Sequence, residues 1–137
     1  MSNTEHELRE LICELGRRLY AKDLVAATDG NLSVRLADGE FLVTPSGVCK
    51  GFMKPEALLI ADDKGQRVRG AGKVTSEFFT HLAAYEERPE ILAVIHAHPP
   101  MCTALTLAGI DMRLPLLPEL VAAVGGVPAC PYATPGT

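Results

Sequence analysis

The sequence predicts an α/β protein, and three features of the chain predict it. Residues 4–21 repeat leucine and isoleucine with the period of an amphipathic helix, and Thr4 and Glu7 have capping-box spacing at its start. Asp38-Gly39 is a strong hairpin turn between two short apolar runs. The continuous, largely β-branched run over residues 91–96 then has the composition of a buried strand.

Composition and charge exclude several classes of protein. Of the 137 residues, 47% are hydrophobic, so we expect a single globular domain over residues 1–137. The formal net charge is −4 and the lysines and arginines are scattered, which argues against a nucleic-acid partner. The absence of a signal sequence and of an apolar span of membrane length predicts a cytoplasmic protein without a membrane partner. No close pair suggests a disulfide or a zinc knuckle among Cys13, Cys49, Cys102 and Cys130.

The first hairpin is predicted around Asp38-Gly39. Residues 28–36 supply a turn that feeds its first strand, and residues 40–43 form the returning strand. Two interpretations of Gly30 and Asn31 stay open. The pair could simply be the turn that opens the hairpin, or Gly30 could let an oxyanion approach the backbone while the Asn31 amide donates to it.

A second tight turn, Thr44-Pro45-Ser46-Gly47, leaves this hairpin. Taken alone it is only a turn. Beside Gly30-Asn31, the Ser46 hydroxyl and the Gly47 amide could supply further donors to the same anion. Residues 58–60 have the composition of a third strand, which returns through a second hairpin.

Thr75-Ser76-Glu77 has the chemistry of a helix N-terminus, and Pro89 lies just past the end of the helix that follows. The Thr75 and Ser76 hydroxyls could act as helix caps or as anion ligands, since helix N-termini bind phosphate readily. Glu77 could be an acid that complements the helix dipole or a catalytic acid/base. His81 is expected to be structural.

Two histidines, His96 and His98, end the predicted strand over residues 91–96. The side-chain period of two places both imidazoles on one face, where they could ligate zinc or form a hydrogen-bonded structural pair. A catalytic zinc usually has three protein ligands and one open position, so a third ligand is needed. We expect Glu77 nearby, because the strand is the element that follows its helix.

The C-terminal part of the chain is rich in prolines. Pro99-Pro100 suits the first turn of a helix that runs to Gly109. Residues 112–118 are expected to be irregular, and residues 127–137 to be extended.

Five motifs, in this order, resemble the class II aldolase/adducin family, with the fuculose-phosphate aldolases as close relatives. The resemblance runs over essentially the whole chain. It implies a three-layer αβα fold with a mainly antiparallel central sheet. The motifs are Gly30-Asn31-Leu32-Ser33, Thr44-Pro45-Ser46-Gly47, Thr75-Ser76-Glu77, His96-Ala97-His98 and Tyr132-Ala133-Thr134-Pro135-Gly136-Thr137.

The resemblance also implies a function in carbohydrate metabolism. The implied reaction is a zinc-dependent retro-aldol cleavage, in which a lyase splits a small phosphorylated or carboxylated substrate through a metal-stabilised enediolate. His96 and His98 match two zinc ligands, and Glu77 matches the acid/base carboxylate. The active sites of such relatives lie between the subunits of a homotetramer. The positions that match phosphate-binding residues are Gly30, Asn31, Ser46, Gly47, Thr75 and Ser76.

The chain departs from the family pattern in two places. The third zinc histidine of the family falls beyond Thr137, so we expect that a C-terminal part is missing. Glu119 stands where fuculose-phosphate aldolases carry a tyrosine, which favours another substrate or reaction. The alternative functions are those of a decarboxylase, an epimerase, a dehydratase, a non-catalytic adducin-like domain or a metal-binding module. Manganese, cobalt or iron could replace zinc.

Overall fold

The computed structural model describes residues 4–114 and 118–134. The described chain forms two compact units, residues 4–98 and residues 99–134. The first unit contains the sheet and every candidate site residue named above. The organisation of residues 1–137 as one domain stays a prediction.

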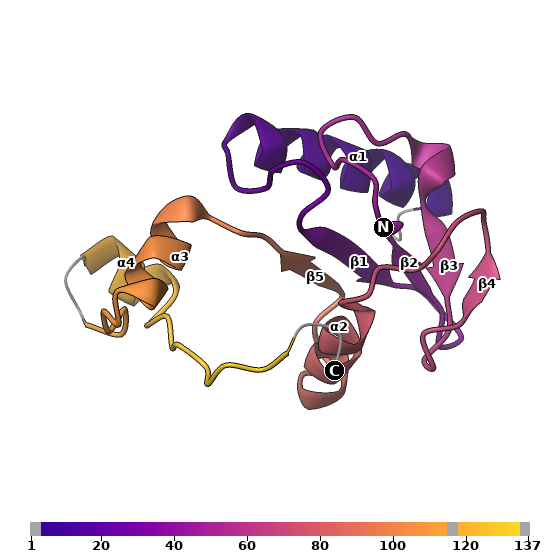
Figure 1. Cartoon of the computed structure of the whole chain (residues 1–137). Helices are drawn as coiled ribbons and strands as arrows, with labels where there is room; N and C mark the ends of the chain where they lie inside the picture. Colours follow the sequence, from indigo (N-terminus) through magenta and orange to yellow (C-terminus); the bar gives the residue numbers. More distant parts are fainter. Residues whose placement is uncertain (1–3, 115–117, 135–137) are drawn as a thin grey trace. The chain divides into compact units, whose positions relative to one another are not determined.

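A five-stranded antiparallel sheet is the centre of the first unit (Figure 1). The strand order is β4-β3-β2-β1-β5, so the last strand in the sequence lies beside the first. This long-range pairing brings the end of the predicted histidine strand to the start of the first hairpin. The strands are β1 (Asn31–Arg35), β2 (Phe41–Val43), β3 (Leu59–Ala61), β4 (Arg67–Arg69) and β5 (Ala93–His96).

Two helices cover the two faces of this sheet. Helix α1 (Glu5–Ala21) begins with the predicted capping box, and its Ile12 and Cys13 pack on one face with Leu42 and Ile60. The second helix, α2 (Phe78–Glu87), packs on the opposite face. Helix α1, the sheet and helix α2 therefore form the expected three-layer αβα arrangement.

The alternation of side chains along the central strands explains why both faces need a helix. In β2, Leu42 joins the α1 core, whereas Phe41 and Val43 join the core under α2. A strand that is buried on both faces has a continuous apolar sequence, as β2 has. A short 3-10 helix, η1 (Pro55–Ala57), precedes β3 on the α1 side.

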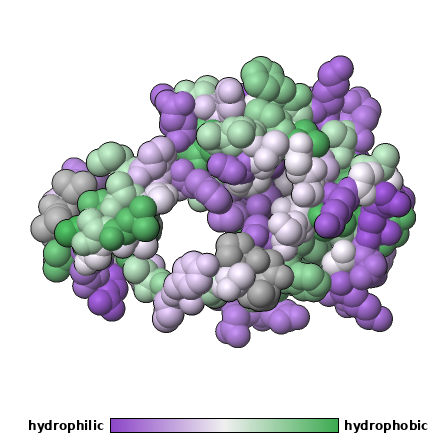
Figure 2. All heavy atoms as spheres, in the orientation of Figure 1, coloured by the Kyte–Doolittle hydropathy of each residue, from purple (hydrophilic) through white to green (hydrophobic). Residues whose placement is uncertain are grey.

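The expected hairpin turn between β1 and β2 is confirmed. Asp38 and Gly39 both have positive φ, 58° and 74°, as a type I′ turn requires. In the second hairpin, the Asp62 carboxylate accepts hydrogen bonds from the backbone amides of Lys64 and Gln66. Hydrophilic residues gather over β4 at this end of the sheet, where all three strand residues are exposed (Figure 2).

The expectation that residues 91–96 form a buried strand is wrong in two respects. Strand β5 begins at Ala93, because the Ile91 amide instead closes a turn on the Arg88 carbonyl. It is also an edge strand that pairs only with β1 among the described residues, and Ile95 is 51% exposed. The side chains of Val94 and His96, on the α2 face, are partly buried.

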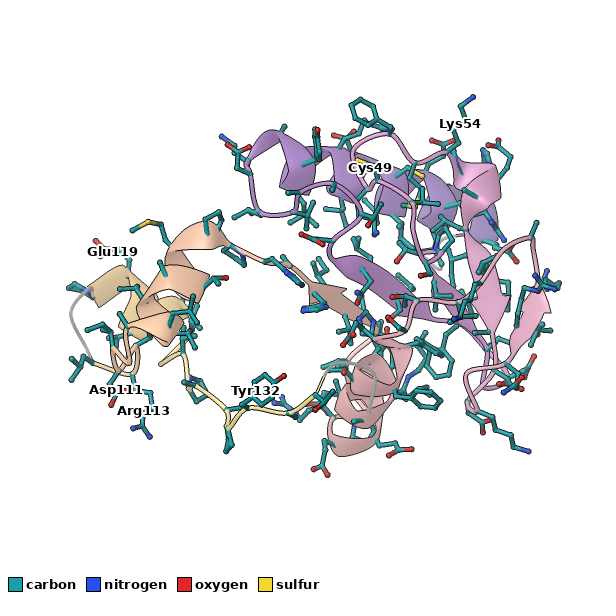
Figure 3. The ribbon with its side chains drawn as sticks, viewed as in Figure 1. Cys49, Lys54, Asp111, Arg113, Glu119 and Tyr132 are labelled. Atoms are coloured by element: carbon teal, nitrogen blue, oxygen red, sulfur yellow. The ribbon has the colours of Figure 1, made fainter. Side chains whose placement is uncertain are left out.

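The second unit is helical. Helix α3 (Pro100–Leu107) has a proline in its first turn, as predicted, and α4 (Pro118–Ala123) begins where an irregular segment was expected to end. Asp111 and Arg113 form an ion pair beside these helices (Figure 3). Part of the motif over residues 132–137 lies outside the described residues. No helix in the described ranges is long and apolar enough to cross a bilayer.

Candidate active site

The segments that carry the candidate residues meet at one end of the central strands. Asn31 begins β1 and is paired with His96 at the end of β5. The Leu32 amide donates to Thr44 Oγ1 over 3.1 Å, which holds the turn after β2 against the start of β1. The Ser46 amide donates to the Lys73 carbonyl over 2.8 Å, which brings the same turn to the segment that precedes α2.

The two histidines lie on the same side of β5, as the strand period predicts. Their ring centroids are 4.8 Å apart, and the His98 amide is anchored on the Leu24 carbonyl. His96 Nδ1 is buried and has no hydrogen-bond partner in the part of the chain that the structure describes. A structural pair would satisfy this nitrogen, so the geometry disfavours the hydrogen-bonded interpretation.

The surroundings of His96 favour the neutral form of its imidazole. Burial lowers its pKa most, and the neighbouring His98 lowers the pKa further. The Glu77 carboxylate acts in the opposite direction, so Glu77 lies within electrostatic reach of the pair. Neutral imidazole is the form that ligates metals.

The donor set fits part of a divalent-metal site. Two imidazoles converge, and one buried ring nitrogen has no partner within the described ranges of the chain. Over residues 4–114 and 118–134, however, no third His, Cys, Asp or Glu completes a cluster that could hold a metal ion. Any further ligand has to come from water, the substrate or residues beyond those described.

The hydroxyls of Thr75 and Ser76 do not act as helix caps, so that interpretation is wrong. Helix α2 begins at Phe78 with Glu77 as its N-cap, and no side chain caps it. The turn is closed by the backbone instead, from the Phe78 amide to the Thr75 carbonyl. Neither hydroxyl is used by the helix. Ser76 is exposed, as are Ser46 and Gly47 on the neighbouring turn, whereas Thr75 is buried.

Lys50 was missed by sequence reasoning. Its side chain is buried, and its Nζ donates to the carbonyls of Thr28 and Val48 over 2.8 and 2.7 Å. Burial lowers the pKa of this amine. One side chain thus joins the segment before Gly30 to the segment after Gly47, which holds two of the candidate anion loops together.

A buried hydrogen-bonded network lies beneath the site. Its centre is His81, which was expected from the sequence to be structural. His81 Nε2 is 2.5 Å from Asn31 Oδ1, and its Nδ1 is 2.6 Å from Ser33 Oγ. Ser33 Oγ is also 2.8 Å from Tyr85 Oη. The spacing of His81 and Tyr85 on one helix face, opposite alternate residues of β1, was the signal in the sequence.

We expect His81 to make the stability of the chain depend on pH. Burial, and secondarily the charge of His96, lower the pKa of His81 from 6.5 to about 4. Below pH 6.5 this histidine binds a proton in the unfolded chain but not in the folded one. The contribution of His81 to the free energy of unfolding is therefore fully present above pH 6.5 and decreases on acidification. From about pH 8 to about pH 5 the chain should lose about 2 kcal/mol through this group.

The measurement is urea unfolding of the wild type and of His81→Gln, both with EDTA, across this pH range. His96 and the carboxylates titrate in both proteins, so the difference between the two slopes isolates His81. Equal slopes would show that His81 is not held neutral in the folded chain.

An open pocket of about 520 Å³ lies between the second hairpin and the start of α2. Thr75 and Ser76 line it together with Arg67 and Lys73. Arg67 already donates to the Gly72 carbonyl. The pocket is lined by two of the candidate anion-binding residues but not by the histidine pair.

Fold and site together define a class of protein. Residues 10–137 match the model of the class II aldolase and adducin N-terminal domain, and the chain belongs to this family. The crystal structure of YgbL from Klebsiella pneumoniae superimposes with a TM-score of 0.88 at 35% identity, covering 99% of this chain and 67% of that one.

Named relatives catalyse different reactions. The chain is 40% identical over 138 residues to a 3-oxo-tetronate 4-phosphate decarboxylase of Cupriavidus necator, covering 98% of this chain and 63% of the relative. It is 38% identical over 112 residues to the L-fuculose phosphate aldolase of Escherichia coli, covering 80% of this chain and 50% of the relative. The chain thus spans less than two thirds of the length of these relatives.

Proposed function

We propose that the chain carries the metal- and phosphate-binding part of a carbon–carbon lyase that acts on a small phosphorylated keto compound. The observation that carries this proposal is the histidine pair at the end of β5. Its buried His96 Nδ1, beside Asn31, has no partner among the residues that the structure describes. We further propose decarboxylation of a phosphorylated 3-oxo acid as the reaction, which is supported by the 40% identity to a decarboxylase of this kind. Retro-aldol cleavage is the second candidate, supported by the similarity to an aldolase.

Both reactions need the same chemistry at one carbon. A carbon–carbon bond breaks, its electron pair stays on the carbon next to a carbonyl group, and that carbon then takes up a proton. The leaving fragment is carbon dioxide in the decarboxylation. In the retro-aldol cleavage it is an aldehyde, which forms from a hydroxyl group that gives up its proton as the bond breaks. With 3-oxo-tetronate 4-phosphate or fuculose 1-phosphate as substrate, the other product is dihydroxyacetone phosphate in both cases.

Residues of the chain would divide this work. Asn31, Ser46, Gly47, Thr75 and Ser76 would hold the phosphate group, with Gly30 as the turn that enables their approach. His96 and His98 would hold a divalent ion, with zinc preferred, which would draw electron density from the carbonyl and hydroxyl oxygens of the substrate. Glu77 would move the proton to and from the reacting carbon. A homotetramer in the cytoplasm stays a prediction.

The test is metal content and turnover in one series. The chain is stripped with EDTA, given zinc and analysed for metal beside the double variant His96→Ala, His98→Ala and the control His6→Ala, whose histidine is exposed on α1. We expect about one ion per chain in the wild type and control, and none in the double variant. Equal metal content in all three would contradict the assigned ligands.

Turnover is measured on the same proteins by release of carbon dioxide from 3-oxo-tetronate 4-phosphate. Exchange of the hydroxymethyl hydrogens of dihydroxyacetone phosphate with D2O is the second readout, because it reports proton transfer whichever bond is cleaved. Bound metal without either reaction would favour a metal-binding module over a lyase.

A further inference from the structure

The network under the site runs without a break from α2 to the start of β1. Tyr85, Ser33, His81 and Asn31 are joined in this order by hydrogen bonds of 2.8, 2.6 and 2.5 Å. All four side chains are buried, and His81 is fully inaccessible. A buried histidine with both ring nitrogens bonded has one tautomer fixed by its partners.

The direction of the network follows from its Asn31 end. Asn31 Oδ1 faces His81 Nε2, and an amide oxygen can only accept, so Nε2 carries the ring hydrogen and donates it. His81 Nδ1 then accepts from the Ser33 hydroxyl, and Tyr85 donates its hydrogen to Ser33 Oγ. The Asn31 amide nitrogen faces away from His81.

We propose that His81 is a positioning residue, which fixes the Asn31 amide so that its nitrogen, and not its oxygen, faces a bound anion. The proposal rests on the proposed role of Asn31 in phosphate binding. Over residues 4–114 and 118–134, Asn31 Nδ2 donates to no acceptor, whereas Asn31 Oδ1 is bonded to His81. The nitrogen is therefore the atom of this amide that is left to bind a ligand. The reverse direction would present Oδ1, which repels anions.

Ser33, His81 and Asn31 have the order of a nucleophile, a base and an orienting group, but the geometry excludes that function. The Ser33 side chain is 1% exposed, and its hydroxyl is engaged by both His81 and Tyr85. A nucleophile needs access to its substrate. The network acts on the site only through Asn31.

The test uses inorganic phosphate as probe and the EDTA-treated 137-residue chain, so that metal does not contribute. Calorimetry gives the phosphate Kd for the wild type, Asn31→Ala, His81→Asn, His81→Gln and the double variant Asn31→Ala, His81→Asn. The Gln side chain keeps a donor near the place of Nε2, whereas Asn keeps only the bond to Ser33. Thermal unfolding of each variant shows that it is folded.

We expect Asn31→Ala and His81→Asn each to weaken phosphate binding about 10-fold, which is typical of a hydrogen bond to a charged group. The double variant should be no weaker than Asn31→Ala alone, and His81→Gln should bind within about 3-fold of the wild type. If the role of His81 were merely structural, both His81 variants would have a lower melting temperature. The fold-losses of phosphate affinity in Asn31→Ala and His81→Asn would then multiply in the double variant.

A second readout separates this inference from the proposed function. Nitrogen-15 NMR of the imidazoles should show His81 neutral, with a pyrrole-like Nε2 and a pyridine-like Nδ1. A hydrogen on Nδ1 overturns the inference, whatever phosphate does. Loss of affinity in Asn31→Ala but not in His81→Asn also overturns it and leaves the proposed function intact. No effect of Asn31→Ala, with Nε2 protonated, would instead contradict the anion-binding role of Asn31.

Discussion

Replacing Gly30 by alanine should destabilise the chain by about 4 kcal/mol or more, which places it among the exceptional single substitutions. Gly30 has φ +69°, where an L side chain is strained. A Cβ there would lie 2.5 Å from Val25 Cγ1 and 2.8 Å from the His96 carbonyl oxygen. Since that oxygen belongs to the backbone of β5, relief requires the histidine strand to move away from β1.

The matched control is Gly39→Ala in the hairpin turn. Gly39 has nearly the same φ, +74°, but a Cβ there meets nothing within 4 Å. We expect a cost of about 1 kcal/mol from the backbone conformation alone. Urea unfolding of both variants measures the difference. Similar losses at the two positions would show that β5 does not approach Gly30 as closely as the structure has it.

Local features of the chain were predicted well because local physics determines them. The capping box of α1 and the Asp38-Gly39 turn depend on residues a few positions apart, and both are confirmed. The faces of the strands follow from a period of two. This is why His96 and His98 could be placed on one side before their surroundings were known.

The supports of the site could not be predicted, because they depend on contacts between distant segments. Gly30 was interpreted either as a turn residue or as room for an anion, and neither interpretation includes its nearest neighbours. These are Val25 and the backbone of His96, which pairs with β1 only through the strand order. Lys50 resembles any surface lysine in the sequence. Its burial becomes favourable only where the carbonyl of the distant Thr28 joins that of the nearby Val48 around its amine. The exposed face of β5 was likewise missed, since an apolar run does not show whether a strand lies at an edge.

Replacing Glu77 by glutamine should lower the rate of hydrogen exchange into dihydroxyacetone phosphate about 1000-fold in the zinc-loaded protein, within the range known for general acid–base groups. Glutamine keeps the size of the side chain but cannot carry the proton. Glu77 is the N-cap of α2 without using its side chain for capping, so the substitution removes no cap hydrogen bond. The fold, the zinc content and the phosphate Kd should therefore stay as in the wild type.

Glu87→Gln is the control on the same helix, since Glu87 is an exposed acid in the last turn of α2, at the end remote from the site. It should exchange hydrogen at the wild-type rate. Both variants remove one negative charge from α2, so a general effect of charge should slow hydrogen exchange equally in both. A lower rate in Glu77→Gln alone would identify Glu77 as the proton carrier. If Glu77→Gln loses zinc together with activity, the negative charge of Glu77 beside His96 is needed to hold the metal, and the loss of exchange does not report the proton carrier. If it keeps both zinc and the full exchange rate, another group moves the proton, and the acid/base role has to be assigned outside the start of α2.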